Sequence, residues 1–387
     1  MNRTLRRGLM KTFCTILTIL CLLLIAPYLR YTSYIPEDNK PFTGSHWYNP
    51  YSDISDSLLR ANFHAHSRSW GGLTWGKNSA EEVIEAYQAQ GYQIPVLSNY
   101  HRIADSSLYE ESVVYIPAYE HGFNLKKIHC LCIGAHETSF VEYPLHFSTN
   151  LTTHVIYNLR RHCDLVALAH PGARRAHEPD EMPALHGMQL MEVANTQGAR
   201  TLYWDTMLSS GQPVWFLAND DSHDLNGSEA FMRWNMIYVN SPTASEALAS
   251  LKRGNHYGVS SYDGECEDNR LTEFEFHRDT LWITLRDMFN RLDFIGQDGV
   301  QLHSVSRNTT GWYLLRETDT YVRAEVHHDH CVMYLNPVVR YDGVTLPQEG
   351  MSAPGQNEVK TWVGRLLFLL LFGIVIICWR RVMRRLT

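Results

Sequence analysis

Histidines and carboxylates recur in the middle of the chain at points where apolar segments end. The first pair, His64 and His66, follows Arg60 to Phe63, a segment that is typical of a short β-strand. A strand places residues i and i+2 on one face, so these two imidazoles could ligate one metal ion. An isolated His-x-His pair is more often two ordinary surface or core histidines than a metal site. The metal interpretation therefore depends on ligand-type residues in later segments.

Later apolar segments supply the same residue types. The segments that we predict as strands are 94–98, 113–116, 127–134, 165–169, 189–193 and 213–217. The ligand-type residues in or just after them are His101, Glu120, His129, His170, Glu192, Asp221 and His223. Neutral imidazoles and carboxylates suit Zn, Mn or Fe, and a bridging carboxylate can hold two ions about 3.5–4 Å apart. Agreement among several strand ends is much less expected by chance than one pair.

Helices are predicted between these strands, which makes residues 58–262 an α/β domain. The first helical segment begins at Ser79, which forms a capping-box pattern with Glu82. The later helical segments cover 152–161, 200–210 and 244–253, and a last strand covers 234–240. In parallel α/β barrels the loops after the strands build the active site, and seven or eight strands fit the count. From Leu271 the pattern alternates with period two and lacks helices, which predicts a small antiparallel β-sandwich within 263–351.

The combined motifs resemble a known family. His64-x-His66, Glu120, His129, Ala169-His170-Pro171 and Asp221-x-His223 come in the order of the polymerase and histidinol phosphatase (PHP) domain, over about residues 58 to 260. The trailing segments Tyr321-Val322-Arg323 and Tyr334-Leu335-Asn336-Pro337 resemble the branch that includes carbaryl-hydrolase-like metallohydrolases. The resemblance implies a distorted (β/α)7 barrel of PHP type, two or three divalent ions, and hydrolysis of a phosphoester or, in that branch, a carbamate ester.

The resemblance also implies a role for each ligand. His64, His66, Glu120 and Asp221 would hold one ion, while Glu120 would bridge to a second ion held by His129 and His170. His101 and His223 match ligands of a third ion. The chain departs from the family after the first pair, where 67–72 contains no His or Asp, and Tyr100 precedes His101 in place of an Asp. In the implied hydrolysis, Asp221 or His223 would also move a proton to the leaving group.

Other polar residues have two interpretations. Glu192 matches an acidic position of the family and equally suits a carboxylate that orients a ligand imidazole, a role also open to Asp220. Arg68, Lys77, Arg174 and Arg175 follow metal motifs and could contact an anionic substrate, or they are solvated loop charges. The histidines that we predict to lie at the surface are His121, His136, His146, His154, His162, His177 and His186.

Apolar runs lie near both ends of the chain. Phe13 to Leu29 follows several basic residues, and Trp362 to Trp379 precedes Arg380, Arg381, Arg384 and Arg385. Both are just long enough to span a bilayer. Basic flanks predict that both termini are cytoplasmic and that the middle lies on the other side, with a cleaved signal peptide as the alternative for the first run. Because the family resemblance points to a bacterium, we expect the inner membrane, with the catalytic domain periplasmic.

These segments divide the chain. We expect an anchor or signal at 1–30, a stalk at 31–57, a linker at 352–360, a transmembrane helix at 361–380 and a basic cytoplasmic tail at 381–387. The formal net charge of −7 disfavours a nucleic-acid partner. Five cysteines lie between the apolar runs, an odd number without a metal or disulfide pattern. We expect mainly buried thiols, and the spacing assigns no bridge.

The predicted function is a membrane-anchored, extracytoplasmic metal-dependent hydrolase, with a phosphoesterase favoured. The substrate would be a small-molecule or lipid-head-group ester. The alternatives are a carbamate or carboxyl-ester hydrolase with the same fold, and a non-catalytic binding module stabilised by metal.

Overall fold

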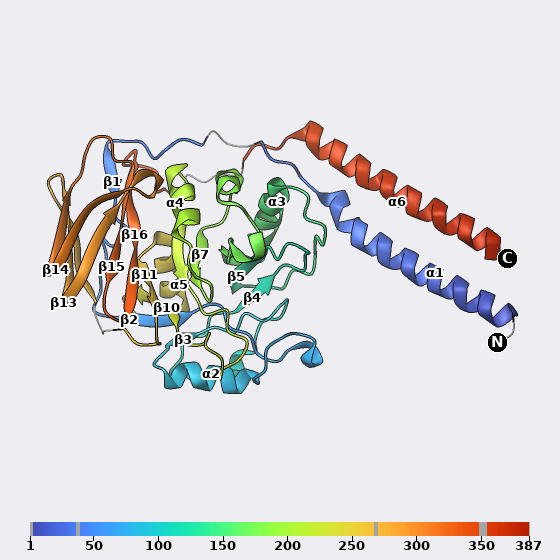
Figure 1. Cartoon of the computed structure of the whole chain (residues 1–387), viewed down its shortest axis with the longest axis horizontal. Coiled ribbons are helices and arrows are strands. Elements are labelled where there is room, and N and C mark those ends of the chain that lie inside the picture. The colour runs from blue at the N-terminus through green and yellow to red at the C-terminus, as the bar shows by residue number, and fades with distance from the viewer. Residues whose placement is uncertain (1–2, 36–38, 267–269, 348–353, 387) are drawn as a thin grey trace.

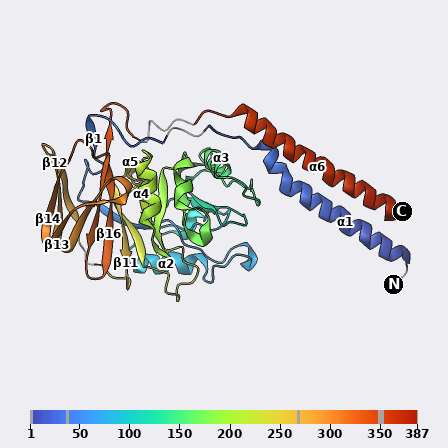
Figure 2. The same ribbon diagram turned by 45° about the horizontal axis from the view of Figure 1, so that its top comes forward.

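The computed structural model describes residues 3–35, 39–266, 270–347 and 354–386. It shows a mixed α/β body from which two long helices extend together (Figure 1). The antiparallel strands of the C-terminal half lie at the opposite end of the body from these helices, in both views (Figures 1 and 2).

One sheet has ten strands and contains both early and late parts of the chain. Its strands are β1 (His46–Tyr48), β2 (Leu58–Asn62), β3 (Ile94–Pro95), β10 (Arg233–Tyr238), β11 (His256–Ser261), β12 (Leu271–His277), β13 (Thr280–Ile295), β14 (Gln301–Leu314), β15 (Tyr321–His327) and β16 (Cys331–Tyr341). The order is β12-β13-β15-β16-β11-β10-β2-β3, with β1 paired to β16 and β14 paired to β13. The predicted sandwich strands therefore continue the sheet that contains β2.

The second sheet has six strands. They are β4 (Ala118–His121), β5 (His129–Ala135), β6 (Cys163–Ala169), β7 (Leu190–Asn195), β8 (Gly198–Ala199) and β9 (Trp215–Ala218). β7 pairs in parallel with β6 and β9, whereas β5 is antiparallel to both β4 and β6. The connection from β4 to β5 is too short for the crossover that a parallel pair needs. The described strands form no closed barrel, so the predicted (β/α)7 barrel is not confirmed.

The two predicted strands before β4 differ most from the structure. Only Ile94 and Pro95 of the predicted segment 94–98 form a strand, and 113–116 forms none. Proline has no N–H to donate to a β-ladder. Pro95 lies within the first of these segments, and Pro117 directly follows the second. The pairing with β5 instead begins at Ala118.

The predicted helices are confirmed to within a few residues. They are α2 (Ala80–Ala89), α3 (Thr149–Leu159), α4 (Thr201–Ser209) and α5 (Ala244–Arg253). Ser79 and Glu82 form the predicted capping box of α2, in which the Glu82 N–H donates to Ser79 Oγ and the Ser79 N–H donates to Glu82 Oε2. Gly91, with φ of 78°, follows this helix in the left-handed region that glycine adopts without strain.

A common apolar core joins the two sheets. Phe63, Ile94 and Ile237 come from the ten-stranded sheet or its ends, and they share a buried cluster with Leu131 and Leu165 of the six-stranded sheet. Backbone hydrogen bonds also connect the two sheets near the strand ends. The His66 N–H donates to Ser222 O, and the Glu120 N–H donates to Ser98 O. The strand ends that carry the candidate ligands are thus held at one place.

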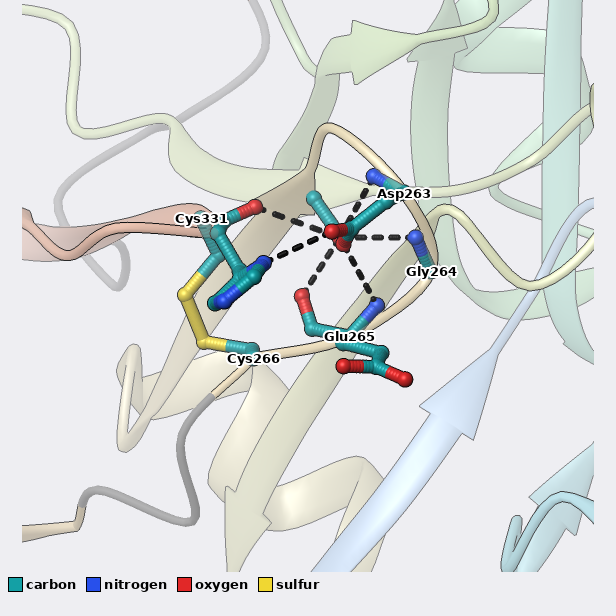
Figure 3. The surroundings of a disulfide bond; sticks show 7 residues. Asp263, Gly264, Glu265, Cys266 and Cys331 are labelled. Carbon is teal, nitrogen blue, oxygen red and sulfur yellow. Dashed lines mark hydrogen bonds and ion pairs between the residues drawn. A yellow bond between two sulfur atoms is a disulfide. The ribbon is translucent and has the colours of Figure 1, made fainter.

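The late strands are fixed to the rest of the body by polar and covalent contacts. Arg323 on β15 makes a bidentate pair with Asp205 on α4, with N–O distances of 2.7 and 2.8 Å, and both residues are buried. Cys266 and Cys331 form a disulfide next to β11, beside the turn that carries Asp263 (Figure 3). The sequence did not assign this bridge, whereas Cys130, Cys132 and Cys163 are free and buried as predicted.

The two terminal helices could cross a membrane by length and composition. α1 (Arg3–Ile25) with the following 3-10 turn, and α6 (Glu358–Leu386), have a mean hydropathy of 2.3 over their most apolar stretches, and their apolar side chains are exposed. They lie side by side (Figures 1 and 2), and Trp379 Nε1 donates to Thr15 Oγ1. Arg365 Nε donates to Tyr31 O where the helices leave the body.

The buried Asp205–Arg323 pair yields a stability prediction. Asp205→Ala should lower the free energy of unfolding by about 3–5 kcal/mol, because the guanidinium of Arg323 would stay buried without its bidentate partner. Chemical denaturation of the detergent-solubilised chain measures this change. The double variant Asp205→Leu/Arg323→Met removes both charges and should recover most of the loss. A free energy of unfolding for Asp205→Ala within about 1 kcal/mol of the parent value would contradict the expectation.

Candidate metal centre

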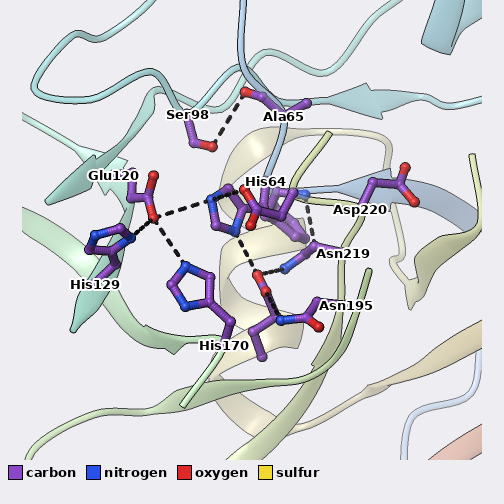
Figure 4. A network of polar contacts seen from close by, with 12 residues as sticks. His64, Ala65, Ser98, Glu120, His129, His170, Asn195, Asn219 and Asp220 are labelled. Carbon is purple, nitrogen blue, oxygen red and sulfur yellow. Dashed lines mark hydrogen bonds and ion pairs between the residues drawn. The ribbon is translucent and has the colours of Figure 1, made fainter. Parts of the chain in front are cut away.

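Glu120 on β4 lies at the centre of the candidate site (Figure 4). Its side chain is fully buried. Its Oε1 lies 2.6 Å from His129 Nδ1 and 3.4 Å from both His64 Nε2 and His170 Nε2. Its Oε2 lies 3.2 Å from His66 Nε2. Four imidazoles from three segments of the sequence therefore surround one carboxylate.

Strand direction explains why these side chains meet. His64 and His66 follow β2, and His170 follows β6, whereas His129 is the first residue of β5. Because β5 runs antiparallel to β4 and β6, its first residue lies at the same end as the last residues of its neighbours. His129 is accordingly paired with Ala169, next to His170.

Asp221 completes the group around the first histidine pair. Its Oδ1 lies 3.2 Å from His64 Nε2 and 3.3 Å from His66 Nε2. The segment that carries it is tied to the first strand end, because the Asp221 N–H donates to His64 O. Ligand atoms in the sets His64/His66/Glu120, His64/His170/Asp221 and Glu120/His129/His170 lie within 4.8 Å of one another.

The polar atoms that face this space fit a cation. His64 Nε2, His66 Nε2, Glu120 Oε2 and His129 Nδ1 are buried and make no hydrogen bond to any residue that the structure describes. A buried polar atom without a partner costs about 1–3 kcal/mol, so native sites seldom leave several together. Divalent ions would accept lone pairs from all four atoms, and the donor set of imidazoles and carboxylates suits Zn, Mn or Fe.

Contacts behind the histidines fix which ring nitrogen carries the proton. His64 Nδ1 lies 2.7 Å from Glu192 Oε2 and donates to it, which leaves the lone pair of Nε2 directed at Glu120 and Asp221. Asn195 and Asn219 each donate to Glu192 at 3.2 Å and hold that carboxylate in place. Glu192 thus has the position that the orienting role requires. His223 Nδ1 likewise donates to Asp221 O, which leaves its Nε2 free.

Asp220 is a structural anchor in this geometry. It is fully buried and accepts hydrogen bonds from Asn62 Nδ2, Tyr87 OH and the backbone N–H groups of Phe231, Met232 and Arg233, all at 2.6–3.0 Å. Burial raises the pKa of Asp220 to about 6, against the opposing effect of these bonds. Asp220 connects the end of β2 to α2 and to the segment before β10, so it holds Asp221 in position through the backbone.

The charges of the site act strongly on one another. Burial favours neutral His64, but the carboxylates of Asp221, Glu192 and Glu120 outweigh it and raise the pKa of His64 well above its ordinary value. The pKa values of His66 and His170 are raised for the same reason. Burial opposes ionisation of Glu120, yet His129 and His64 hold its pKa well below the usual range. The ion-free site therefore attracts cations, either protons or metal ions.

His101 points to a different group from the one expected. Its Nε2 lies 2.6 Å from Glu142 Oε1, and its Nδ1 donates to Ser139 O. His121, predicted to lie at the surface, is buried and lies 3.8 Å from the same carboxylate oxygen. Together these three side chains form a separate group with metal-ligand atoms within 4.8 Å. Sequence reasoning missed Glu142 because it lies in a loop, away from any predicted strand end.

Three more of the predicted surface histidines, His154, His177 and His186, are buried as well.

The backbone around the site is strained. Eleven described non-glycine residues have positive φ, and five of them are predicted site residues: His101, His170, Arg174, Arg175 and Asp221. Each such conformation costs about 1–3 kcal/mol and persists only where the surroundings impose it, which happens most often at functional sites. The segment from His170 to Arg175 thus turns sharply enough to aim His170 back at Glu120 and to bring Arg174 to the opening.

A cleft of about 570 Å³ opens over the ligand cluster. His129, His170, Asp221 and His223 lie on its wall, together with His101 and Tyr100. Lys127 and Arg174 add positive charge to the same wall, and the sequence interpretation named only the second of these. Of the other predicted substrate contacts, Lys77 pairs with Asp224 at 2.6 Å and Arg68 donates to Lys77 O. Arg175 is exposed and, like these two, is not part of the cleft wall.

Comparison with known proteins shows only distant structural likeness. No protein-family model matches the chain, and a search of curated proteins finds no match either. A similar solved structure is the two-domain protein containing a predicted PHP-like metal-dependent phosphoesterase from Bacteroides vulgatus ATCC 8482. It shares 12% identity and a TM-score of 0.41, over 79% of this chain and 92% of that chain. A likeness this distant decides nothing about function, so the proposals below rest on this chain's own residues.

The contact between His64 and Glu192 predicts an effect on metal affinity. Glu192→Gln should weaken metal binding about 10–100-fold, because the amide no longer fixes His64 in the tautomer that directs Nε2 inward. Titration with Zn²⁺ against a competing chelator measures the affinity. Glu137→Gln is a matched control, since Glu137 makes a similar 2.8 Å contact with His162 Nδ1 away from the cluster. Equal affinities in the two variants would contradict the orienting role.

The raised pKa values of His64, His66 and His170 predict proton release when metal binds. Below these pKa values protons occupy the imidazoles and compete with the ion, so metal affinity should rise with pH until the rings are neutral. Calorimetric titration with Zn²⁺ in buffers of different ionisation enthalpy counts the released protons. A binding enthalpy that is the same in every buffer would show that no proton leaves.

Proposed function

We propose that the chain is a metal-dependent hydrolase of esters, with a phosphoester as the favoured substrate class. The observation that carries this proposal is the convergence of His64, His66, His129 and His170 on buried Glu120, with Asp221 beside His64 and His66. That arrangement supports two ions that share Glu120, as the PHP resemblance implies. His101 lies with Glu142 instead, so our proposal for the cluster around Glu120 uses two ions.

Hydrolysis adds water across the ester bond. The oxygen of water bonds to phosphorus, the bond to the leaving oxygen breaks, and the proton lost by water ends on that oxygen. Bound divalent ions supply Lewis acidity, which lowers the pKa of water and stabilises developing negative charge. No Ser or Cys nucleophile is then required, in keeping with the absence of one from the cleft wall of the described chain.

The residues of the cleft suit the remaining tasks. Burial, together with neighbouring His66, lowers the pKa of His223, and this side chain on the cleft wall can accept and return a proton. Burial keeps the phenol of Tyr100 protonated, and its ring stacks on His66 at 5.1 Å. Arg174 and Lys127 favour an anionic substrate, which is why we prefer a phosphoester to the neutral carbamate or carboxyl esters.

We further propose that α1 and α6 anchor the enzyme in a membrane, with both basic termini in the cytoplasm and the body on the other side. The Cys266–Cys331 disulfide supports this location, because such bonds persist in oxidising compartments.

The first test is loss of the histidine pair. His64→Ala and His66→Ala should each reduce bound metal and reduce ester hydrolysis to the level of the blank, because the ion that these two imidazoles would hold loses a ligand. Assays on phosphomonoesters, phosphodiesters, carbamates and carboxyl esters would identify the substrate class. His136→Ala alters an exposed histidine and should change neither property. Hydrolysis that survives without metal would refute the proposal, and full metal binding without turnover would favour a binding module.

A further inference from the structure

Apolar side chains surround the opening of the cleft. Leu73, Trp75, Phe123 and Leu125 lie on its wall, and their exposed fractions are 86%, 74%, 72% and 81%. We call these four residues the apolar rim. They come from two separate loops, one after the His64–His66 pair and one between β4 and β5. Large apolar side chains that gather at one opening while facing water mark a surface with an apolar partner.

A third loop, between β5 and α3, extends this apolar surface. Phe140, Leu145 and Phe147 in this loop are 66%, 55% and 49% exposed. The loop contacts both rim loops, because the Leu125 N–H donates to Pro144 O and the rings of Trp70 and Phe140 meet edge to face at 6.5 Å. The three loops therefore contact one another beside the cleft, and each of them exposes apolar side chains.

The same third loop packs against the two candidate membrane helices. The ring of Phe147 lies 5.3 Å from that of Tyr31 and 5.7 Å from that of Phe368 on α6. Tyr28, which follows α1, stacks on Phe368 at 4.4 Å and donates a hydrogen bond to Leu145 O. Both views show the helices leaving the body next to the loops around α3 (Figures 1 and 2). The third loop thus connects the rim loops to the root of the helix pair.

Deeper in the cleft the chemistry changes from apolar to polar. Lys127 and Arg174 are exposed on the same wall as the rim, whereas the ligand residues His129 and His170 on that wall are buried. An amphiphile matches this arrangement, because its anionic head group suits the cations and the ligand cluster and its hydrocarbon tail suits the apolar rim. A small polar ester would leave the rim in water, and nothing in its chemistry would account for four exposed apolar side chains.

We infer that the apolar rim enters the outer interface of the bilayer, and that the cleft takes its substrate from the membrane as a lipid whose head group is a phosphoester. The head group lies at the ligand cluster while the tail passes over the rim into the bilayer. Trp75 suits this position, since tryptophan favours the interface between head groups and acyl chains. This inference rests on the proposed hydrolase function for its choice of substrate, but not for the contact with the bilayer.

A fluorescence experiment tests the contact without any catalysis. The full chain is reconstituted in phosphatidylcholine vesicles with or without brominated acyl chains, which quench only nearby tryptophans. Replacing Trp75 by Phe should remove a clear share of the quenchable fluorescence. Trp312→Phe is the control, because Trp312 is 47% exposed on β14, far from the helices in both views. An equal effect of the two substitutions would overturn the inference.

A kinetic experiment tests the substrate class with the same full chain. The variant Leu73→Ser/Trp75→Ser is compared with Trp312→Ser/Leu314→Ser, a matched pair of exposed apolar residues on β14. The rim variant should lose about tenfold or more in kcat/KM on dodecyl phosphate in vesicles, as expected from apolar area left in water, and less than about twofold on soluble 4-methylumbelliferyl phosphate. The control variant should have the same kcat/KM as the parent on both substrates.

The outcomes separate the two proposals. Equal losses on the soluble and the membrane substrate, or no loss on either, would overturn the inference while the hydrolase proposal stands. If neither phosphoester is cleaved by the parent chain, the phosphoesterase proposal fails, and the fluorescence result still decides whether the rim enters the bilayer.

Discussion

The charge of Glu120 is the constraint on which the site depends. Moving a carboxylate out of water costs several kcal/mol unless positive charge replaces the lost hydration. Here the replacement comes from four directions, because imidazole nitrogens of His64, His66, His129 and His170 lie within 2.6–3.4 Å of its oxygens. Asp221 adds a second carboxylate to the same space. Two buried carboxylates among lone-pair donors form a site for divalent cations, and the network behind it keeps the donors aimed inward.

That network is shared between the two sheets, which links fold to chemistry. Glu192 and Asn195 belong to the six-stranded sheet, whereas Asn62 belongs to the ten-stranded one. Asp220 holds Asn62 and the segment before β10 together, and Asn336 on β16 accepts a hydrogen bond from the Phe216 N–H on β9. The late strands therefore support the ligand-bearing strand ends through a common core. A perturbation of the Asp205–Arg323 contact or of the disulfide would reach the site through this support.

Local signals in the sequence located the helices and the residues that surround Glu120. Alternation of apolar strands with His, Glu and Asp at their ends located the residues that surround Glu120, and Ser79 with Glu82 located the start of α2. Long-range pairing was beyond such signals. The late strands join β11 instead of standing apart, through pairing with a strand distant in sequence. The antiparallel direction of β5 follows from the short connection after β4, a local feature that the prediction of a parallel barrel did not use. His101 shows the same limit, because its neighbour Glu142 lies in a loop without a periodic pattern.

Anomalous diffraction from crystals of the chain loaded with Zn²⁺ or Mn²⁺ tests the central claim most directly, because it locates each ion among its ligands. The account predicts one ion about 2.0–2.2 Å from His64 Nε2, His66 Nε2 and an oxygen of Asp221, and a second ion at His129 and His170, with Glu120 coordinating both. Ions bound elsewhere on the chain, or no ion between these side chains at saturating metal, would contradict it.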